Sequence, residues 1–356
     1  MTMLLFLAGL ALLVLGAELL VRGASRLAAA VGLSPLVIGL TVVAYGTSMP
    51  ELVVSTQAAW AGRPEIAVGN VVGSNIFNVL FILGIAALIL PLRVAQRLVW
   101  WDVPIMIGTA IALAGFAADG TVSRPEGLVL VGGIVAYTIW VVRVSRRETR
   151  EVEAEYDEAY GGARGMPAWG SALLAAAGLV LLVVGARWLV EAAVTIARTV
   201  GLGDAVVGLT IVAAGTSLPE VATSIVAAVR GERDIAVGNV VGSNIFNVLA
   251  VLGASALVAR DGIVMPPAIY RFDLPVMLAV SLACLPIFFT GHTISRWEGG
   301  AFLAYYVAYT AYLVLDATGH DTLPAFATVM LAFVAPLTAL TLLVVTSREL
   351  LARRRA

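Results

Sequence analysis

The sequence predicts an all-α integral membrane protein made of two inverted five-helix repeats and one extra C-terminal helix. Three features support this fold class: the composition, eleven apolar segments of membrane-spanning length, and an internal repeat. Of the 356 residues, 60% are hydrophobic and 13% are charged, and the formal net charge is -1. A chain this apolar is unsuited to a water-exposed globular surface, which excludes a soluble enzyme. Its charge offers no basic face for nucleic acid.

The membrane-spanning segments follow from their length. A hydrocarbon core about 30 Å thick needs roughly 20 apolar residues per helix. The first apolar segment has no positively charged leader and stays apolar beyond Glu18 and Arg22, so we expect a retained span rather than a cleaved signal. The eleven segments are 3–29, 35–59, 66–90, 102–119, 125–144, 169–199, 204–229, 234–258, 273–290, 297–316 and 324–346.

The internal repeat sets the domain organisation. Residues 32–84 align with residues 201–253 without a gap, and 34 of the 53 positions are identical. Five predicted spans separate equivalent points of the two copies, and because five is odd, the second copy enters the membrane in the opposite orientation. The predicted organisation is a first half at 1–145, a cytoplasmic linker at 146–168, an inverted second half at 169–316, and a C-terminal helix with a basic tail at 317–356.

The distribution of arginine predicts the orientation. When the loop at 143–166 is placed inside, the cytoplasmic segments hold 16 arginines and the outer segments hold five. The positive-inside rule then predicts a multi-pass protein of the cell membrane (plasma or inner), with its N-terminus outside and its C-terminus in the cytoplasm. Membrane lipid is an expected partner. The oligomeric state is left open, with a monomer allowed.

The motif AYGTSMPE at 44–51 returns as AAGTSLPE at 213–220. Proline has no N–H and its ring clashes with the carbonyl four residues back, so each motif should break its helix. Unwound backbone in a membrane is tolerated only where it lines a cavity or binds something, so matched breaks in two repeats predict a site at the midplane. The helix-breaking residues are Gly46 and Pro50 in the first copy and Gly215 and Pro219 in the second.

A carboxylate follows each break, Glu51 or Glu220. Even lenient insertion scales give a charged group at mid-membrane a cost of roughly 3 kcal/mol, so two such groups need a functional reason. Helical spacing puts a threonine one turn before each carboxylate, and a serine stands next to that threonine. These hydroxyl residues are Thr47, Ser48, Thr216 and Ser217.

A second motif, IAVGNVVGSNIFNVL, occurs verbatim at 66–80 and 235–249. Oxygen ligands without His or Cys favour hard cations such as Ca²⁺ and Na⁺. Two carboxylates balance one Ca²⁺ or two monovalent ions, which gives a physical basis for exchange at shared ligands. The motif places a serine and an asparagine four residues apart on one side of each helix: Ser74 and Asn78, and Ser243 and Asn247.

Together, the duplicated blocks resemble the α-repeats of the sodium/calcium exchangers, within the cation/calcium antiporter superfamily, in a compact prokaryotic form. The resemblance implies a secondary-active antiporter that exchanges Ca²⁺ for Na⁺ by alternating access, with no cofactor besides the transported ions. It implies Ca²⁺ ligands at Glu51, Glu220, Thr47 and Thr216. It also implies sodium ligands at the carbonyls of Ala44 and Ala213 and the side chains of Ser48, Ser217, Ser74, Ser243, Asn78 and Asn247. Some members carry aspartate in place of one of these asparagines, so the sodium stoichiometry stays open.

Two other transport functions stay open. Protons could replace sodium on buried carboxylates, which would give an antiporter of Ca²⁺, or of another cation, for H⁺. Polar rings could instead line the open pore of a cation channel, although inverted broken helices favour a carrier. An enzyme is not expected, because neither serine motif has a histidine partner and the sequence has no phosphate loop.

The first and sixth spans are long and free of helix-breaking proline, so we expect them to slide during alternating access. Each carries two opposite charges four residues apart, for which structural ion pairing is expected. Asp102 and Asp273 stand where spans begin beside aqueous loops, and we expect ordinary interfacial carboxylates there. The two charged pairs are Glu18 with Arg22 and Arg187 with Glu191.

Overall fold

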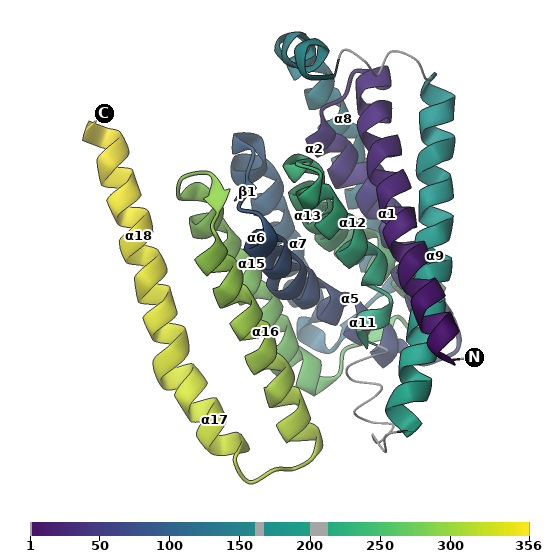
Figure 1. Ribbon diagram of the computed structural model, residues 1–356. Helices are drawn as coiled ribbons and strands as arrows, with labels where there is room; N and C mark the ends of the chain where they lie inside the picture. Colours follow the sequence, from purple (N-terminus) through teal and green to yellow (C-terminus); the bar gives the residue numbers. More distant parts are fainter. Residues whose placement is uncertain (1, 161–166, 200–212, 356) are drawn as a thin grey trace.

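The computed structural model describes residues 2–160, 167–199 and 213–355, almost all in helices packed side by side (Figure 1). Nine described helices are long and apolar enough to cross a membrane, and the bent pair Pro35–Thr47 and Met49–Trp60 makes a tenth span. These spans match ten of the eleven predicted segments. The other predicted segment, 204–229, is described only from residue 213 onward.

The first half starts with one long helix and continues with broken ones. Its spans are α1 (Thr2–Val31); α2 (Pro35–Ile38), η1 (Gly39–Val43), α3 (Ala44–Thr47) and α4 (Met49–Trp60); α5 (Pro64–Phe77), η2 (Asn78–Leu83) and α6 (Gly84–Ile89); η3 (Leu98–Asp102), α7 (Val103–Phe116) and η4 (Ala117–Asp119); and α8 (Arg124–Tyr160). The helix α8 therefore continues through residues 146–160, the first part of the predicted linker.

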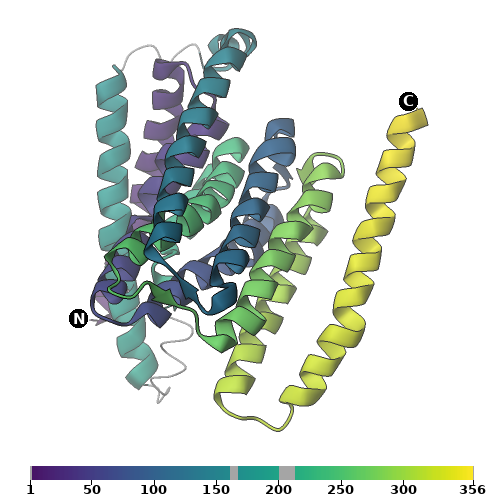
Figure 2. The ribbon, with the colours of Figure 1, turned by 180° about the vertical axis from the view of Figure 1, so that it is seen from behind.

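The second half repeats this order. Its elements are α9 (Ala168–Thr199); α11 (Ala213–Gly215) and α12 (Leu218–Val229); α13 (Arg233–Phe246), η6 (Asn247–Leu252) and α14 (Gly253–Val258); η7 (Ile269–Asp273) and α15 (Leu274–Phe289); and α16 (Arg296–Ala317). The C-terminal span consists of α17 (Leu323–Val329), η8 (Met330–Val334) and α18 (Ala335–Arg355). It lies at the edge of the bundle beside α15 and α16 (Figures 1 and 2).

Two short antiparallel ribbons join the halves. The strand β1 (Leu92–Arg93) pairs with β4 (Thr293–Ile294), and β2 (Thr121–Val122) pairs with β3 (Ile263–Val264). Each ribbon takes one strand from each half, so it holds a loop of one half beside a loop of the other half at the same end of the bundle.

The long helices α1 and α9 lie against each other along their length (Figure 2). Glycines allow their backbones to approach closely: a Cβ atom on Gly16 would lie 2.7 Å from the backbone nitrogen of Leu182. Small residues at such contacts are typical of packed membrane helices. The expected ion pairs of these helices are present, Glu18 with Arg22 and Arg187 with Glu191.

Burial separates the motif helices from the rest. The spans α5–α6 and α13–α14 are the most buried of the nine unbroken spans among the described residues. Apolar side chains of the C-terminal span, such as Leu331 and Phe333, are largely exposed. In a membrane protein such exposed apolar side chains face lipid. The two spans that carry the second motif therefore lie at the centre of the bundle.

Candidate ion-binding site

In each of the two copies of the first motif, the helix breaks at the serine. Ser48 separates α3 from α4 with φ -84° and ψ 9°, and the two segments meet at a bend of 46°. Ser217 has nearly the same conformation before α12, φ -88° and ψ 7°. Each motif proline, Pro50 or Pro219, falls in the first turn of the following helix, where a missing N–H leaves no hydrogen bond unmade.

Both carboxylates are buried, Glu51 with 0% and Glu220 with 1% of its surface exposed. Each accepts a hydrogen bond from the serine of the other repeat. Ser217 Oγ donates to Glu51 Oε1 at 2.9 Å, and Ser48 Oγ donates to Glu220 Oε1 at 2.8 Å. The two inverted motifs therefore contact each other reciprocally at the centre of the molecule.

The threonines are held by asparagines that the sequence reasoning missed. Thr47 Oγ1 donates to Asn239 Oδ1 at 3.2 Å, and Thr216 Oγ1 donates to Asn70 Oδ1 at 3.3 Å. Each of these amides also donates, at 2.9 Å in both cases, to a serine one turn after the carboxylate. These serines are Ser55 for Asn70 and Ser224 for Asn239.

A second pair of missed asparagines, Asn75 in α5 and Asn244 in α13, binds the asparagines that begin η6 and η2. Asn78 Nδ2 donates to Asn244 Oδ1 at 2.9 Å, and Asn247 Nδ2 donates to Asn75 Oδ1 at 3.0 Å. Both helices become π-helical at Asn78 and Asn247, a local irregularity that is frequent at functional sites. The missed residues had a signal in the sequence, because all six asparagines of the chain lie in the two copies of this motif.

The remaining predicted residues lie around this network. Ser74 Oγ is 3.2 Å from Ser217 Oγ, and Ser243 Oγ donates to the Ala44 carbonyl at 3.5 Å. That carbonyl also accepts from the Ser48 N–H at 3.0 Å. Ala213 opens α11, whose last residue is Gly215. A Cβ atom on Gly46 or on Gly215 would lie 2.6 Å from a side-chain atom of α9, so both break glycines adjoin that helix.

Four buried oxygens of the predicted site residues have no hydrogen-bond partner among the described residues. They are Glu51 Oε2, Glu220 Oε2, Asn78 Oδ1 and Asn247 Oδ1. Buried acceptors without donors are unfavourable, and most buried polar groups in proteins are paired. All four are oxygen acceptors, the ligand type that hard cations prefer. Within the described residues no group of three or more His, Cys, Asp or Glu forms a metal site. The chemistry therefore suits a cation that is held by two carboxylates and by neutral oxygens.

Comparison with known proteins places this geometry in a family. The family described as "Sodium/calcium exchanger protein" matches residues 1–143 and 170–315. The "Putative antiporter CaxA" of Alkalimonas amylolytica is 40% identical over 251 residues, 69% of this chain and 76% of the relative. The "Sodium/calcium exchanger MaX1" of Methanosarcina acetivorans is 33% identical over 314 residues, 77% of this chain and 87% of the relative.

Solved structures agree with the sequence matches. The sodium-calcium exchanger NCX_Mj, soaked with 2.5 mM Na⁺ and 0.1 mM Ca²⁺, is similar with a TM-score of 0.75 and 33% identity. The match covers 87% of this chain and 97% of that structure. The inverted architecture and the membrane-spanning helices are thereby shared with a transporter of known fold. The chain belongs to the sodium/calcium exchanger family of membrane antiporters and is a transporter, not an enzyme.

Proposed function

We propose that this antiporter exchanges Ca²⁺ for Na⁺ by alternating access, with both ions using the reciprocal site of the two motifs. The observation that carries the proposal is the pair of buried carboxylates. Each has one oxygen bound to the other repeat and one oxygen with no hydrogen-bond partner in the described part of the chain. An ion between them would neutralise charge from both halves at once. Binding or release of the ion would therefore change the interactions between the two halves.

Charge explains why the process would be exchange rather than leak. Two carboxylates in a dry site are unfavourable without a bound cation. One Ca²⁺ or two monovalent ions remove that cost, so the loaded protein can change conformation and the empty protein is held back. The Ca²⁺ ligands we propose are Glu51, Glu220, Thr47 and Thr216.

Neutral oxygens beside the carboxylates would hold sodium. The proposed sodium ligands are the carbonyls of Ala44 and Ala213 and the side chains of Ser48, Ser74, Asn78, Ser217, Ser243 and Asn247. The Asn75 and Asn244 contacts support this role, because they occupy the amide nitrogens of Asn247 and Asn78, and the described residues offer no donor to the oxygens of those two amides.

The orientation we propose is N-terminus outside and C-terminus in the cytoplasm of the cell membrane. The start of α1 and the end of α18 lie at opposite ends of the bundle, as an odd number of spans requires (Figures 1 and 2). The halves 1–145 and 169–316 would be the two inverted units, with α1 and α9 sliding across them. Contact of α9 with both break glycines supports its part in that motion.

The test is ⁴⁵Ca²⁺ uptake into proteoliposomes that hold the purified chain, under an outward Na⁺ gradient, an outward H⁺ gradient, or none. Sodium-driven uptake is the expected result. Uptake driven only by protons would reject sodium coupling in favour of Ca²⁺/H⁺ exchange, and uptake that is independent of any gradient would reject antiport. Sr²⁺ is a useful competitor, since NCX_Mj structures were also obtained with Na⁺ and Sr²⁺.

A further inference from the structure

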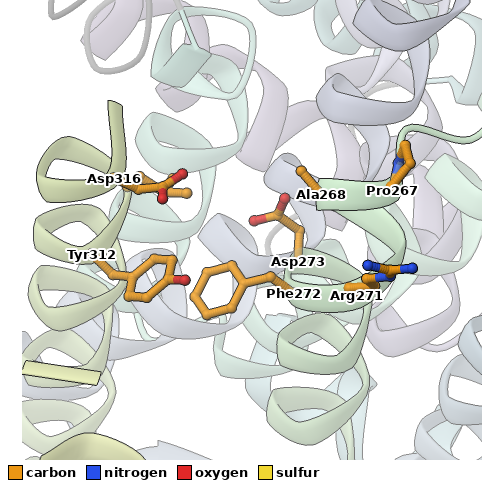
Figure 3. A pocket seen from close by; sticks show the side chains of 8 residues that line it. Pro267, Ala268, Arg271, Phe272, Asp273, Tyr312 and Asp316 are labelled. Atoms are coloured by element: carbon orange, nitrogen blue, oxygen red, sulfur yellow. The ribbon is translucent and has the colours of Figure 1, made fainter. Parts of the chain in front are cut away.

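A pocket of about 300 Å³ lies at one end of the bundle, away from the candidate ion-binding site. It is formed by residues 267–268 and η7 on one side and by the end of α16 on the other. Figure 3 shows the carboxylates of Asp273 and Asp316 on either side of it, next to the rings of Phe272 and Tyr312, with Arg271 beyond Asp273. The rings of Phe272 and Tyr312 are stacked, with 3.9 Å between their centroids.

The pocket has an equivalent place in the first half, because the internal symmetry extends beyond the motif repeat. The π-helical segments η3 and η7 correspond at an offset of 171 residues, so Asp102 corresponds to Asp273. The helices α8 and α16 correspond at an offset of 172, so Tyr137 corresponds to Tyr309. Contacts support this alignment: Tyr137 Oη donates to Asp102 at 2.9 Å, and Tyr309 Oη donates to Asp273 at 2.7 Å.

In the first half an arginine fills the equivalent place. The side chain of Arg97 is only 10% exposed, and its Nε lies 4.0 Å from Asp102 Oδ2. Its Nη2 donates to the Val141 carbonyl at 3.2 Å, and its guanidinium carbon lies 5.7 Å from the ring centroid of Trp140. Asp102 is therefore not the interfacial carboxylate expected from the sequence: it is fully buried beside a guanidinium group.

In the second half the arginine is missing and its surroundings remain. At the same offsets Arg97 corresponds to Ala268 and Trp140 to Tyr312, and both Ala268 and Tyr312 line the pocket. The pocket is thus the space that a guanidinium side chain fills in the other half. Asp316, which corresponds to Val144, adds a second carboxylate that the first half lacks.

We propose that this pocket binds an organic cation with a guanidinium or primary ammonium group, seated between Asp273 and Asp316 against the ring of Tyr312. Carboxylates and an aromatic face are the surroundings that favour such groups. Arg97 in the first half is the internal example of the same recognition. A free amine and the headgroup of an aminophospholipid share this chemistry, and both can reach an open pocket at the end of a membrane bundle.

The experiment measures binding of agmatine, which carries both groups, to the purified full chain by calorimetry at constant ionic strength. Asp316→Asn should weaken binding about fivefold, the scale of one partly exposed charge pair. Asp321→Asn, an exposed carboxylate just beyond α16, is the matched control and should leave binding unchanged. Ala268→Arg should abolish binding, because it supplies the side chain that the first half uses.

Two outcomes would overturn the proposal. One is an agmatine titration that gives no more heat of binding than a NaCl titration, and the other is undiminished agmatine binding by the Ala268→Arg variant. A second arm uses the first half, where Arg97→Ala should lower the melting temperature and millimolar agmatine should restore part of it, more than NaCl does. Nanodiscs distinguish the source of the cation. Loss of agmatine binding in phosphatidylethanolamine but not in phosphatidylcholine identifies a lipid headgroup, and equal binding in both identifies a soluble amine.

Discussion

At the scale of single residues, the centre of the molecule depends on hydroxyl groups that each reach across to the other repeat. Ser48 and Ser217 each donate a hydrogen bond to the carboxylate of the opposite motif, so Glu51 and Glu220 are each bound to residues of both halves. This reciprocity follows from the inversion, because each motif brings the same side chains to the interface from the opposite side. A substitution at one carboxylate should therefore have the same kind of effect as that substitution at the other carboxylate.

The first prediction concerns these carboxylates. Glu51→Gln and Glu220→Gln should each reduce ⁴⁵Ca²⁺ uptake to the level of protein-free vesicles, because one remaining charge cannot balance a divalent ion. Glu65→Gln, at an exposed glutamate in the first turn of α5, is the control and should transport normally. Normal uptake by either buried variant, at equal insertion, would contradict the proposed Ca²⁺ ligands.

The second prediction concerns the asparagines. Asn244→Ala removes the partner of Asn78 Nδ2 and leaves a buried amide unpaired, which should lower stability by about 1–3 kcal/mol. Asn75→Ala should have an effect of similar size on Asn247, and both variants should need more Na⁺ to release Ca²⁺. Thermal unfolding and the sodium dependence of release measure the two effects. Gln57→Ala, at an exposed amide on α4, should change neither.

At this scale the sequence indicates the types of residue in the site better than it indicates their contacts. The carboxylates were chosen because they follow the helix-breaking prolines, and the hydroxyls and Asn78 and Asn247 were chosen from helical spacing. The structure brings the carboxylates and the serine and threonine hydroxyls together at the helix breaks, and it binds Asn78 and Asn247 to two other asparagines in a separate set of hydrogen bonds. Asn70, Asn75, Asn239 and Asn244 were missed because helical spacing within one segment does not show which residues of the other repeat that segment contacts. Their role depends on contacts 146 to 192 residues apart in the chain.

At the scale of elements, the break in each motif helix is maintained from two sides. Proline prevents a continuous hydrogen-bond ladder, and the serine at the break is bound to the other repeat. Length and composition predicted the spans. The exact turn at Ser48, the π-helical segments and the helical continuation of α8 to Tyr160 were not predicted.

The third prediction tests the break. Pro50→Ala returns an N–H that can bond the Gly46 carbonyl and straighten the helix, so uptake should fall about tenfold at normal expression, the scale of a loss near 1.4 kcal/mol in the transport barrier. Pro64→Ala is the matched control, since Pro64 also stands in the first turn of a helix but follows a loop. Equal uptake by the two variants would mean that the serine contacts alone hold the break.

The fourth prediction concerns the seam between α1 and α9. A Cβ atom on Gly178 would lie 2.5 Å from the backbone nitrogen of Leu20, so Gly178→Ala should force the helices apart and cost about 1–3 kcal/mol. Gly108→Ala is the control, because a Cβ atom there meets no atom of the described residues within 4 Å. It should be neutral or slightly stabilising in a helix interior. Thermal unfolding of both variants measures the difference, and equal melting temperatures would show that the seam adapts.

At the scale of the whole molecule, the strand pairs connect fold and orientation. One ribbon joins residues 92–93 to 293–294, and the other joins residues 121–122 to 263–264. Each ribbon pairs a loop of one half with a loop of the inverted half, so the two loops lie on the same side of the membrane. An odd number of spans between the copies predicted the inversion from sequence. The ribbons themselves were not predicted, because strands of two residues carry no periodic pattern.

The last prediction follows from these ribbons and from the distribution of arginine. Cys284, the one cysteine of the chain, is buried and should stay unlabelled, so cysteines can be introduced one at a time. In right-side-out vesicles, Asp119→Cys and Asp261→Cys should react with a membrane-impermeant maleimide, because both adjoin the outer ribbon. Arg93→Cys and Arg296→Cys adjoin the other ribbon and should react only after permeabilisation. The reverse pattern would invert the proposed orientation and leave the fold intact, whereas labelling of one residue from each ribbon would contradict the pairing of the loops.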